Sequence, residues 1–210
     1  MIRILIADDH AVVRRGLKDI IAETSDMALV AEADSGTEAL RAIATHECDV
    51  IVLDIALSDI NGLEVLKQIR QTHPNARVLI LSVYPEAKYA ERAMRSGAAG
   101  YLTKDRAPEE LLEAIRKAHS GGKYVSETFA ETLATLLSGE AERLPHESLS
   151  DREYEAMCLL AKGLALTEIA AQLGLSDKTI SSYRARILEK LNLKNTTEIV
   201  RYALQHKLVE

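Results

Sequence analysis

The first 120 residues alternate between short apolar runs and longer stretches in which apolar residues recur every three or four positions. The apolar runs lie at residues 2–7, 27–33, 49–53, 77–82 and 99–103, and we expect each to form a strand. Helical periodicity follows each run, at residues 11–24, 36–45, 61–71, 86–96 and 107–120. Strand–helix units in this succession predict an α/β fold, a doubly wound five-stranded parallel sheet with helices on both faces.

The pattern changes after the first domain, residues 1–120. Residues 121–147 open with two glycines, contain an amphipathic stretch at 126–137 and end in a polar segment, so they predict a linker with a short helix. The apolar side chains of this stretch share one side: Phe129, Leu133, Leu136 and Leu137. The amphipathic stretch could dock through this side on either domain or on a second chain. A linker that only tethers the two domains fits the sequence equally well.

Residues 148–210 show helical periodicity only. Ser150 with Glu153, and Asn195 with Glu198, have the spacing of reciprocal N-terminal caps. Between these two helix starts, residues 167–176 precede a longer predicted helix over 177–191.

Two helices that cross at a tight turn need a small residue at the crossing, a residue suited to positive φ at the turn, and an apolar residue returning to the core. Ala170, Gly174 and Ile180 meet these needs at relative positions 0, +4 and +10. The spacing predicts a helix-turn-helix within a small all-α domain.

Composition is that of an ordinary globular protein, with 210 residues of which 47% are hydrophobic and 28% charged. The longest apolar runs are only strand-length, and residues 1–4 lack the apolar core of a signal peptide, so we expect a soluble cytoplasmic protein without a membrane partner. The two cysteines, Cys48 and Cys158, lie far apart and predict neither a disulfide nor a zinc site.

The formal charge of −6 is spread unevenly. Residues 148–210 carry +1, which leaves −7 for residues 1–147. A near-neutral second domain with local clusters of basic residues permits a nucleic-acid partner without requiring one.

Candidate chemistry lies at the carboxyl ends of the predicted strands. Asp8 and Asp9 follow the first strand, Asp54 the third, Ser82 ends the fourth and Lys104 follows the fifth. In the doubly wound order 2-1-3-4-5, the first and third strands are neighbours, and their ends form the switch point where ligands bind. We therefore expect these side chains to converge on one small patch.

This set of residue types fits phosphoryl transfer. Clustered carboxylates repel one another unless a cation is present, and hard oxygen ligands suit Mg²⁺. A carboxylate beside the metal can attack phosphorus and form an acyl phosphate. We assign Asp54 as the nucleophile, Asp8 and Asp9 as metal ligands, and Lys104 and Ser82 as groups that contact the phosphate. His10 follows the acids, but no second His or Cys is placed to join it, so we do not expect it to bind metal.

These residues, with Gly62 eight positions after Asp54 and the segment 100–104, resemble the receiver domain of bacterial two-component response regulators over residues 1–120. The resemblance implies phosphorylation of Asp54 by a partner histidine kinase, with Ser82 and Tyr101 as switch residues. It also implies that the backbone carbonyl of Ala56 coordinates Mg²⁺. The chain departs from many receivers by carrying residues 57–58 as Leu-Ser where they have Met-Pro, and we expect this to alter the stiffness of the loop.

Simpler roles stay open for single residues. Asp8 can act as a charge behind the metal ligands, Tyr101 as a static half-buried aromatic, and Lys104 as a structural ion-pair partner of Asp54.

The longer helix of the second domain has a distinct outward face. At about 100° per residue, the inward face holds Ile180, Ile187 and Leu191. The outward face holds Lys178, Ser182 and Ala185, flanked by Ser181 and Arg186. Small and basic residues suit entry into the major groove of DNA, whereas a solvated face of a protein-binding bundle is the alternative.

The segment 149–208 resembles the DNA-binding domain of NarL/FixJ (LuxR-type) regulators, through residues 168–170, 179–180 and 187–191. The resemblance implies base contacts by Ser181, Ser182 and Ala185, next to the motif residue Thr179. We choose Lys178, Arg184 and Arg186 for contacts to the DNA backbone. Family members often carry Lys and His where this chain has Ser181 and Tyr183, which puts the base preference in doubt.

The combined prediction is a transcription factor that is switched by phosphorylation and is not an enzyme. Its last helix, residues 196–206, is expected to pair two DNA-bound copies, so that a homodimer binds inverted-repeat sites. Two other classes remain open: a constitutive DNA-binding protein whose first domain senses something else, and a phosphotransfer enzyme that uses Asp54 as its intermediate.

Overall fold

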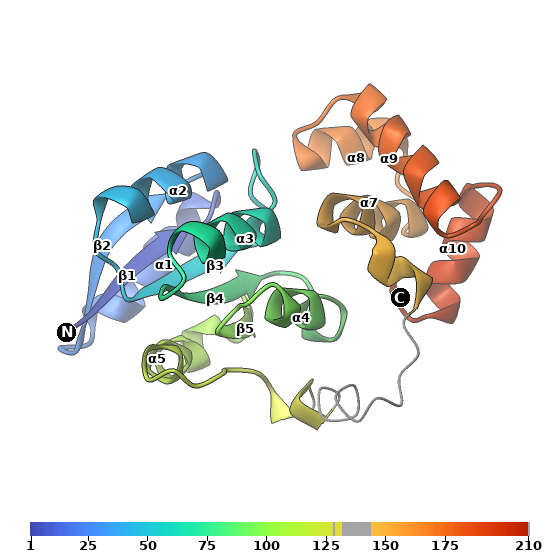
Figure 1. Cartoon of the computed structure of the whole chain (residues 1–210). Helices are drawn as coiled ribbons and strands as arrows, with labels where there is room; N and C mark the ends of the chain where they lie inside the picture. The colour runs from blue at the N-terminus through green and yellow to red at the C-terminus, as the bar shows by residue number, and fades with distance from the viewer. Residues whose placement is uncertain (128, 132–143, 210) are drawn as a thin grey trace. The chain divides into compact units, whose positions relative to one another are not determined.

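A computed structural model describes residues 1–127, 129–131 and 144–209 of the chain. The chain divides into two units, Met1–Ser138 and Gly139–Glu210. Figure 1 shows the strands in the first unit and the helix-turn-helix in the second. Most of the amphipathic stretch expected at 126–137, including Leu133, Leu136 and Leu137, lies outside the described residues.

The apolar runs of the first unit form one parallel sheet. Its strands are β1 (Ile2–Ala7), β2 (Met27–Ala33), β3 (Val50–Asp54), β4 (Arg77–Ser82) and β5 (Gly100–Thr103). They lie in the order β2-β1-β3-β4-β5, which confirms the predicted doubly wound fold. The central strand β3 is buried at every position, because helices cover both of its faces.

Four helices connect the strands: α1 (Ala11–Ala22), α2 (Gly36–Thr45), α3 (Gly62–Thr72) and α4 (Glu86–Arg95). A fifth helix, α5 (Ala107–His119), follows β5. The apolar sides of α1 and α5 pack on one face of the sheet through Leu17, Ile21, Leu111 and Ile115. Figure 1 shows α2 and α3 side by side on the opposite face. Each crossover therefore returns the chain to the same edge of the sheet.

The central strand begins and ends one residue later than the apolar pattern suggests. Asp49 lies before it and bonds to Arg3, whose backbone N donates to Asp49 Oδ2 at 2.8 Å. Asp54 is the last strand residue, paired in register with Leu81, because the backbone ladder continues past the last apolar side chain. The Asp54 carboxylate is thereby fixed by the sheet itself.

The segment after α5 adds to the first unit beyond residue 120. Tyr124 forms an isolated parallel bridge with Gly100, and Tyr101 N donates to Tyr124 O at 2.8 Å. The Tyr124 hydroxyl donates to Glu110 at 2.7 Å, and Ser126 N donates to Glu86 at 2.9 Å. The beginning of the expected linker is thus attached to the edge strand β5 and to both neighbouring helices.

The second unit contains a 3₁₀ turn and four helices among its described residues: η1 (Pro145–Ser148), α7 (Asp151–Ala161), α8 (Leu166–Leu173), α9 (Asp177–Lys190) and α10 (Thr196–Gln205). The reciprocal cap predicted for Ser150 and Glu153 is present at the start of α7.

The second predicted cap, at the start of α10, is only half present. Asn195 Oδ1 accepts from Glu198 N at 3.0 Å. The Glu198 carboxylate accepts instead from Lys194 N, one residue before Asn195, at 2.7 Å.

Within the described residues, no helix is both long and apolar enough to span a membrane.

Candidate functional site

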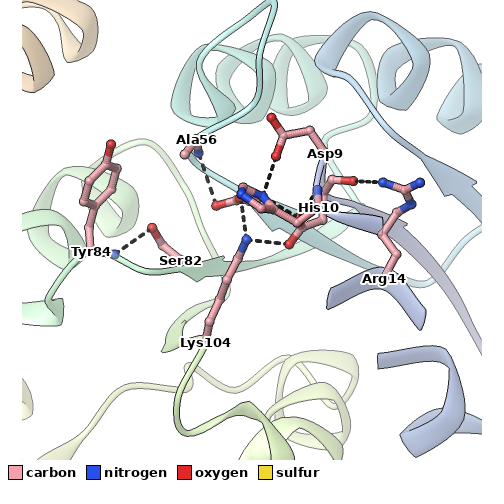
Figure 2. Close-up of polar contacts among 9 residues, drawn as sticks. Asp9, His10, Arg14, Ala56, Ser82, Tyr84 and Lys104 are labelled. Carbon is pink, nitrogen blue, oxygen red and sulfur yellow. Dashed lines mark hydrogen bonds and ion pairs between the residues drawn. The ribbon is translucent and has the colours of Figure 1, made fainter. Parts of the chain in front are cut away.

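The structure brings the predicted acids and the lysine together at the carboxyl edge of the sheet (Figure 2). Lys104 Nζ lies 2.7 Å from Asp54 Oδ2 and 2.7 Å from Asp8 Oδ2. Both carboxylates are 1% exposed, and the Lys104 side chain is 10% exposed. The backbone N of Lys104 donates to Ser82 O at 2.8 Å, which fixes the start of the lysine side chain beside β4. One ammonium therefore bridges two buried carboxylates from neighbouring strands.

The electrostatics of this bridge follow from burial and charge. Burial raises the pKa of Asp54, and the ammonium of Lys104 only partly offsets that effect. Burial alone would lower the pKa of Lys104, but the carboxylates of Asp54 and Asp8 raise it above its ordinary value. The lysine is thus charged at neutral pH, and the carboxylate of Asp54 is held close to a cation.

Asp9 and His10 complete the acidic group. His10 Nδ1 lies 2.7 Å from Asp9 Oδ1, and the His10 backbone N donates to Asp8 Oδ1 at 2.8 Å. Arg14 reaches back from α1 and donates to the backbone carbonyl of Asp8 at 2.6 Å. These contacts fix the turn between β1 and α1, where ligand atoms of both acids lie within 4.8 Å of a ligand atom of Asp54 at the end of β3.

The group has the donor set of a cation site. Ligand atoms of Asp8, Asp9, His10 and Asp54 all lie within 4.8 Å of one another. Asp8 Oδ2 and Asp9 Oδ1 are buried without a hydrogen bond of acceptable geometry, although Lys104 Nζ lies 2.7 Å from the first and His10 Nδ1 lies 2.7 Å from the second. Buried oxygens of this kind are satisfied by a hard divalent cation, so the residues fit Mg²⁺. His10 lies in this group beside Asp9, and the expectation that it does not bind metal stays a prediction.

The two predicted switch residues meet at a third residue, Tyr84. Ser82 is fully buried, and its Oγ accepts from Tyr84 N at 3.1 Å. The Tyr101 hydroxyl donates to Tyr84 O at 2.8 Å. The Tyr84 ring stacks on Tyr89 of α4 with ring centroids 4.5 Å apart. Sequence reasoning missed Tyr84, because nothing in the local pattern marks a loop residue as the link between two strands.

The Asp54 carboxylate also contacts the loop that follows it. Ala56 N donates to Asp54 Oδ1 at 3.2 Å, while Oδ2 faces Lys104. The predicted ligand residue Ala56 is therefore next to the acidic group (Figure 2).

In the second unit, the structure forms the predicted helix-turn-helix from α8 and α9. Gly174 ends α8 with a φ of 65°, the left-handed conformation that the turn requires. Ile180 and Ile187 of α9 are fully buried, and Leu191 after its end is 7% exposed.

The predicted DNA-contacting residues of α9 divide into two groups. The exposed ones are Lys178, Ser181, Ser182, Ala185 and Arg186. Thr179, Tyr183 and Arg184 are partly buried. Arg184 Nε donates to Thr196 Oγ1 at 2.8 Å, so this guanidinium also links α9 to the start of α10.

A doubly wound sheet with an acid–lysine group at its carboxyl edge, joined to a helix-turn-helix unit, defines a receiver with a DNA-binding output domain. Comparison with known proteins agrees. The family model "Response regulator receiver domain" matches residues 4–116. The model "Bacterial regulatory proteins, luxR family" matches residues 147–203.

Relatives match along the whole chain. Response regulator UvrY of Escherichia coli is 36% identical over 209 residues, which cover 99% of this chain and 96% of UvrY. Response regulator GacA of Pseudomonas aeruginosa is 34% identical over 212 residues, covering 100% of this chain and 99% of GacA. The crystal structure of response regulator ChrA, from a heme-sensing two-component system, has a TM-score of 0.53 at 31% identity and covers 99% of this chain and 98% of ChrA.

The chain belongs to the NarL/FixJ family of two-component response regulators, with an amino-terminal receiver and a LuxR-type DNA-binding domain.

Proposed function

We propose that a partner histidine kinase phosphorylates Asp54 and that the acyl phosphate controls DNA binding by the second unit. The observation that carries this proposal is the Lys104 ammonium, 2.7 Å from both Asp54 and Asp8 at the carboxyl edge of the sheet. It provides a carboxylate nucleophile and a cation for the phosphoryl oxygens in one place.

The transfer follows from the chemistry of these groups. An oxygen of Asp54 attacks the phosphorus of phosphohistidine, the P–N bond breaks, and its electron pair returns to the imidazole of the kinase. Negative charge on the phosphoryl oxygens is matched by the Lys104 ammonium and by the N–H of Ala56, which already donates to Asp54. The backbone bond from Lys104 N to Ser82 O positions the lysine before the phosphoryl group arrives.

Asp8, Asp9, Asp54 and the backbone carbonyl of Ala56 would hold Mg²⁺ in this site. When bound, the ion offsets the charge on the transferring phosphoryl group. The ligand atoms of Asp8, Asp9 and Asp54, which lie within 4.8 Å of one another, support this assignment. His10 lies within reach, but its imidazole nitrogen suits softer metals better than Mg²⁺.

The switch begins with Ser82. A phosphoryl oxygen on Asp54 accepts a hydrogen bond from the Ser82 hydroxyl and draws Oγ away from Tyr84 N, from which Oγ now accepts. Release of Tyr84 in turn frees the Tyr101 hydroxyl, which donates to the same residue. Phosphorylation therefore shifts a pre-existing equilibrium of the surface formed by α4 and β5.

DNA recognition is assigned to the outward face of α9. Ser181, Ser182 and Ala185, with Thr179 and Tyr183 beside them, would face base edges in the major groove. Lys178, Arg184 and Arg186 would contact phosphates. A homodimer paired through α10 would then bind an inverted repeat, because the two recognition helices are related by a twofold axis.

The test is selection of fragmented genomic DNA by the purified full chain with Mg²⁺, with and without acetyl phosphate. We expect one inverted-repeat motif to be enriched much more strongly with the phosphodonor, and Asp54→Asn to lose this difference. Asp19→Asn, the same charge change on the exposed side of α1, is the control that keeps the difference. Equal enrichment with and without phosphodonor would refute the switch while keeping DNA binding, and steady release of phosphate over many turnovers would indicate an enzyme.

A further inference from the structure

The loop that leaves the phosphorylation site, residues 55–61 between β3 and α3, is held at two points. Its base is closed by Gly62, whose backbone N donates to Ile55 O at 2.8 Å. The backbones approach so closely there that a Cβ on Gly62 would lie 1.9 Å from Asp54 O. The base of the loop therefore depends on glycine at this position.

The tip of the loop is held by a carboxylate. Asp59 Oδ1 accepts from Gly36 N at 2.7 Å and from Ile60 N at 2.7 Å, and Oδ2 accepts from Thr37 N at 2.9 Å. Gly36 and Thr37 are the first two residues of α2, and the N-cap Ser35 bonds to the third. Asp59 thus caps the first turn of a helix that begins 23 residues earlier, where a negative charge also interacts favourably with the helix dipole.

The fit between the tip of the loop and α2 is close. A Cβ on Gly36 would lie 2.8 Å from Val65 Cγ2, 3.0 Å from Ile60 Cβ and 3.2 Å from Asp59 Oδ1. Burial alone would raise the pKa of Asp59, but the hydrogen bonds from Thr37, Gly36 and Ile60 lower it to about 2. The carboxylate is therefore ionised, with both oxygens engaged by N–H donors.

We propose that Asp59 is a positioning residue for the phosphorylation site, which clamps the loop to α2 and so places Ala56 beside Asp54. This inference rests on the proposed function. Residues 55–61 contain no proline to restrict the backbone. Leu57 is buried and anchors the start of the loop, whereas Ser58 and Asp59 beyond it are exposed. The clamp from Asp59 to α2 holds the exposed side of the loop and thereby stabilises the conformation in which Ala56 N bonds to Asp54.

The expected effect is on the binding of Mg²⁺, because the loop carries the backbone group of Ala56. If only a fraction of the molecules hold the loop in the conformation that binds Mg²⁺, the apparent affinity for Mg²⁺ equals the intrinsic affinity multiplied by that fraction. Asp59→Asn removes the charge and places an amide NH₂ against one N–H donor of α2. We expect its Kd for Mg²⁺ to rise about threefold to tenfold, while the rate of phosphorylation by acetyl phosphate at saturating Mg²⁺ stays within about twofold of wild type.

The experiment uses the full chain in four forms: wild type, Asp59→Asn, Gly36→Ala and the charge control Asp19→Asn. Calorimetric titration with MgCl₂ gives the Kd, and hydrogen exchange gives the protection of the amides of Gly36, Thr37 and Ile60. Gly36→Ala keeps the carboxylate but separates loop and helix, so it should raise the Kd in the same direction. It tests the clamp even where Asp59→Asn unfolds.

The outcomes separate the inference from the proposed function. A higher Kd and faster exchange in both clamp variants, with Asp19→Asn unchanged, support the inference. Faster exchange with an unchanged Kd overturns it, since Asp59 then serves only α2, and equal behaviour of all four forms overturns it as well. If wild type neither binds Mg²⁺ nor accepts a phosphoryl group, the proposed function itself fails and the inference fails with it.

Discussion

Replacement of Lys104 by methionine tests the electrostatic reading of the site. The ammonium lies 2.7 Å from two carboxylates that are each 1% exposed. At an effective dielectric constant of about 20, each of these attractions is worth about 6 kcal/mol before the cost of desolvation is subtracted. Removing one partner of a buried ion pair typically costs about 3–5 kcal/mol, because it leaves uncompensated charge behind. We expect Lys104→Met to lower the unfolding free energy by about 3 kcal/mol at pH 8.

The sign of the pH dependence follows from Asp54. Its pKa in the folded state lies above the ordinary value of 3.8, mainly through burial, so the folded state binds more protons than the unfolded state above that pH. The contribution of Asp54 to stability therefore falls as pH rises from its pKa in the unfolded state to its higher pKa in the folded state. Lys104 opposes the effect of burial, so its removal raises the folded-state pKa of Asp54 further. The pH range over which Asp54 changes stability then extends to higher pH. The loss of stability should be smaller at pH 5.5 than at pH 8, because protonation of Asp54 relieves its repulsion from Asp8.

Scanning calorimetry of the full chain without divalent cations measures this effect. A loss of about 3 kcal/mol corresponds to a decrease of about 10 °C in the Tm of the receiver transition at pH 8. The matched control is Lys18→Met, which removes an exposed ion pair with Glu32 and should cost no more than about 1 kcal/mol. Equal Tm values for Lys104→Met and wild type at pH 8, or a loss that does not depend on pH, would refute the reasoning.

Further substitutions test the fold around the two sites. Gly62→Ala would place a Cβ 1.9 Å from the carbonyl of Asp54, and we expect a loss of about 3 kcal/mol in urea unfolding. An unchanged midpoint would contradict this. Asp49→Asn removes a carboxylate whose pKa the hydrogen bond from Arg3 lowers to about 2. It should cost about 1 kcal/mol at pH 7, and the difference should vanish as pH falls from about 4 to 2; a constant difference would exclude the ion pair as its cause. Gly174→Ala forces a Cβ into a φ of 65° and should destabilise the second unit by about 1 kcal/mol, measured by urea unfolding, with no effect on the receiver transition.

The sequence alone determined the features that local physics controls. Apolar runs and the geometry of parallel sheets predict a buried strand that ends near Asp54, and they place Asp8 and Lys104 directly after two other strands. Gly174 at the turn before α9 follows from the conformation that a short helix connection demands. In each case one short segment contains both the signal and its structural consequence.

Tertiary packing decided the contacts between segments that are distant in the sequence. Asp59 caps α2 only because α2 and α3 lie side by side on the sheet, and Tyr124 pairs with β5 only because α5 returns the chain to that edge. Tyr84 links Ser82 with Tyr101 through backbone groups, which are the same in every residue type. Backbone donors and acceptors are common to all residues, so their partners are fixed by where the packed elements place them and not by the local pattern of side chains.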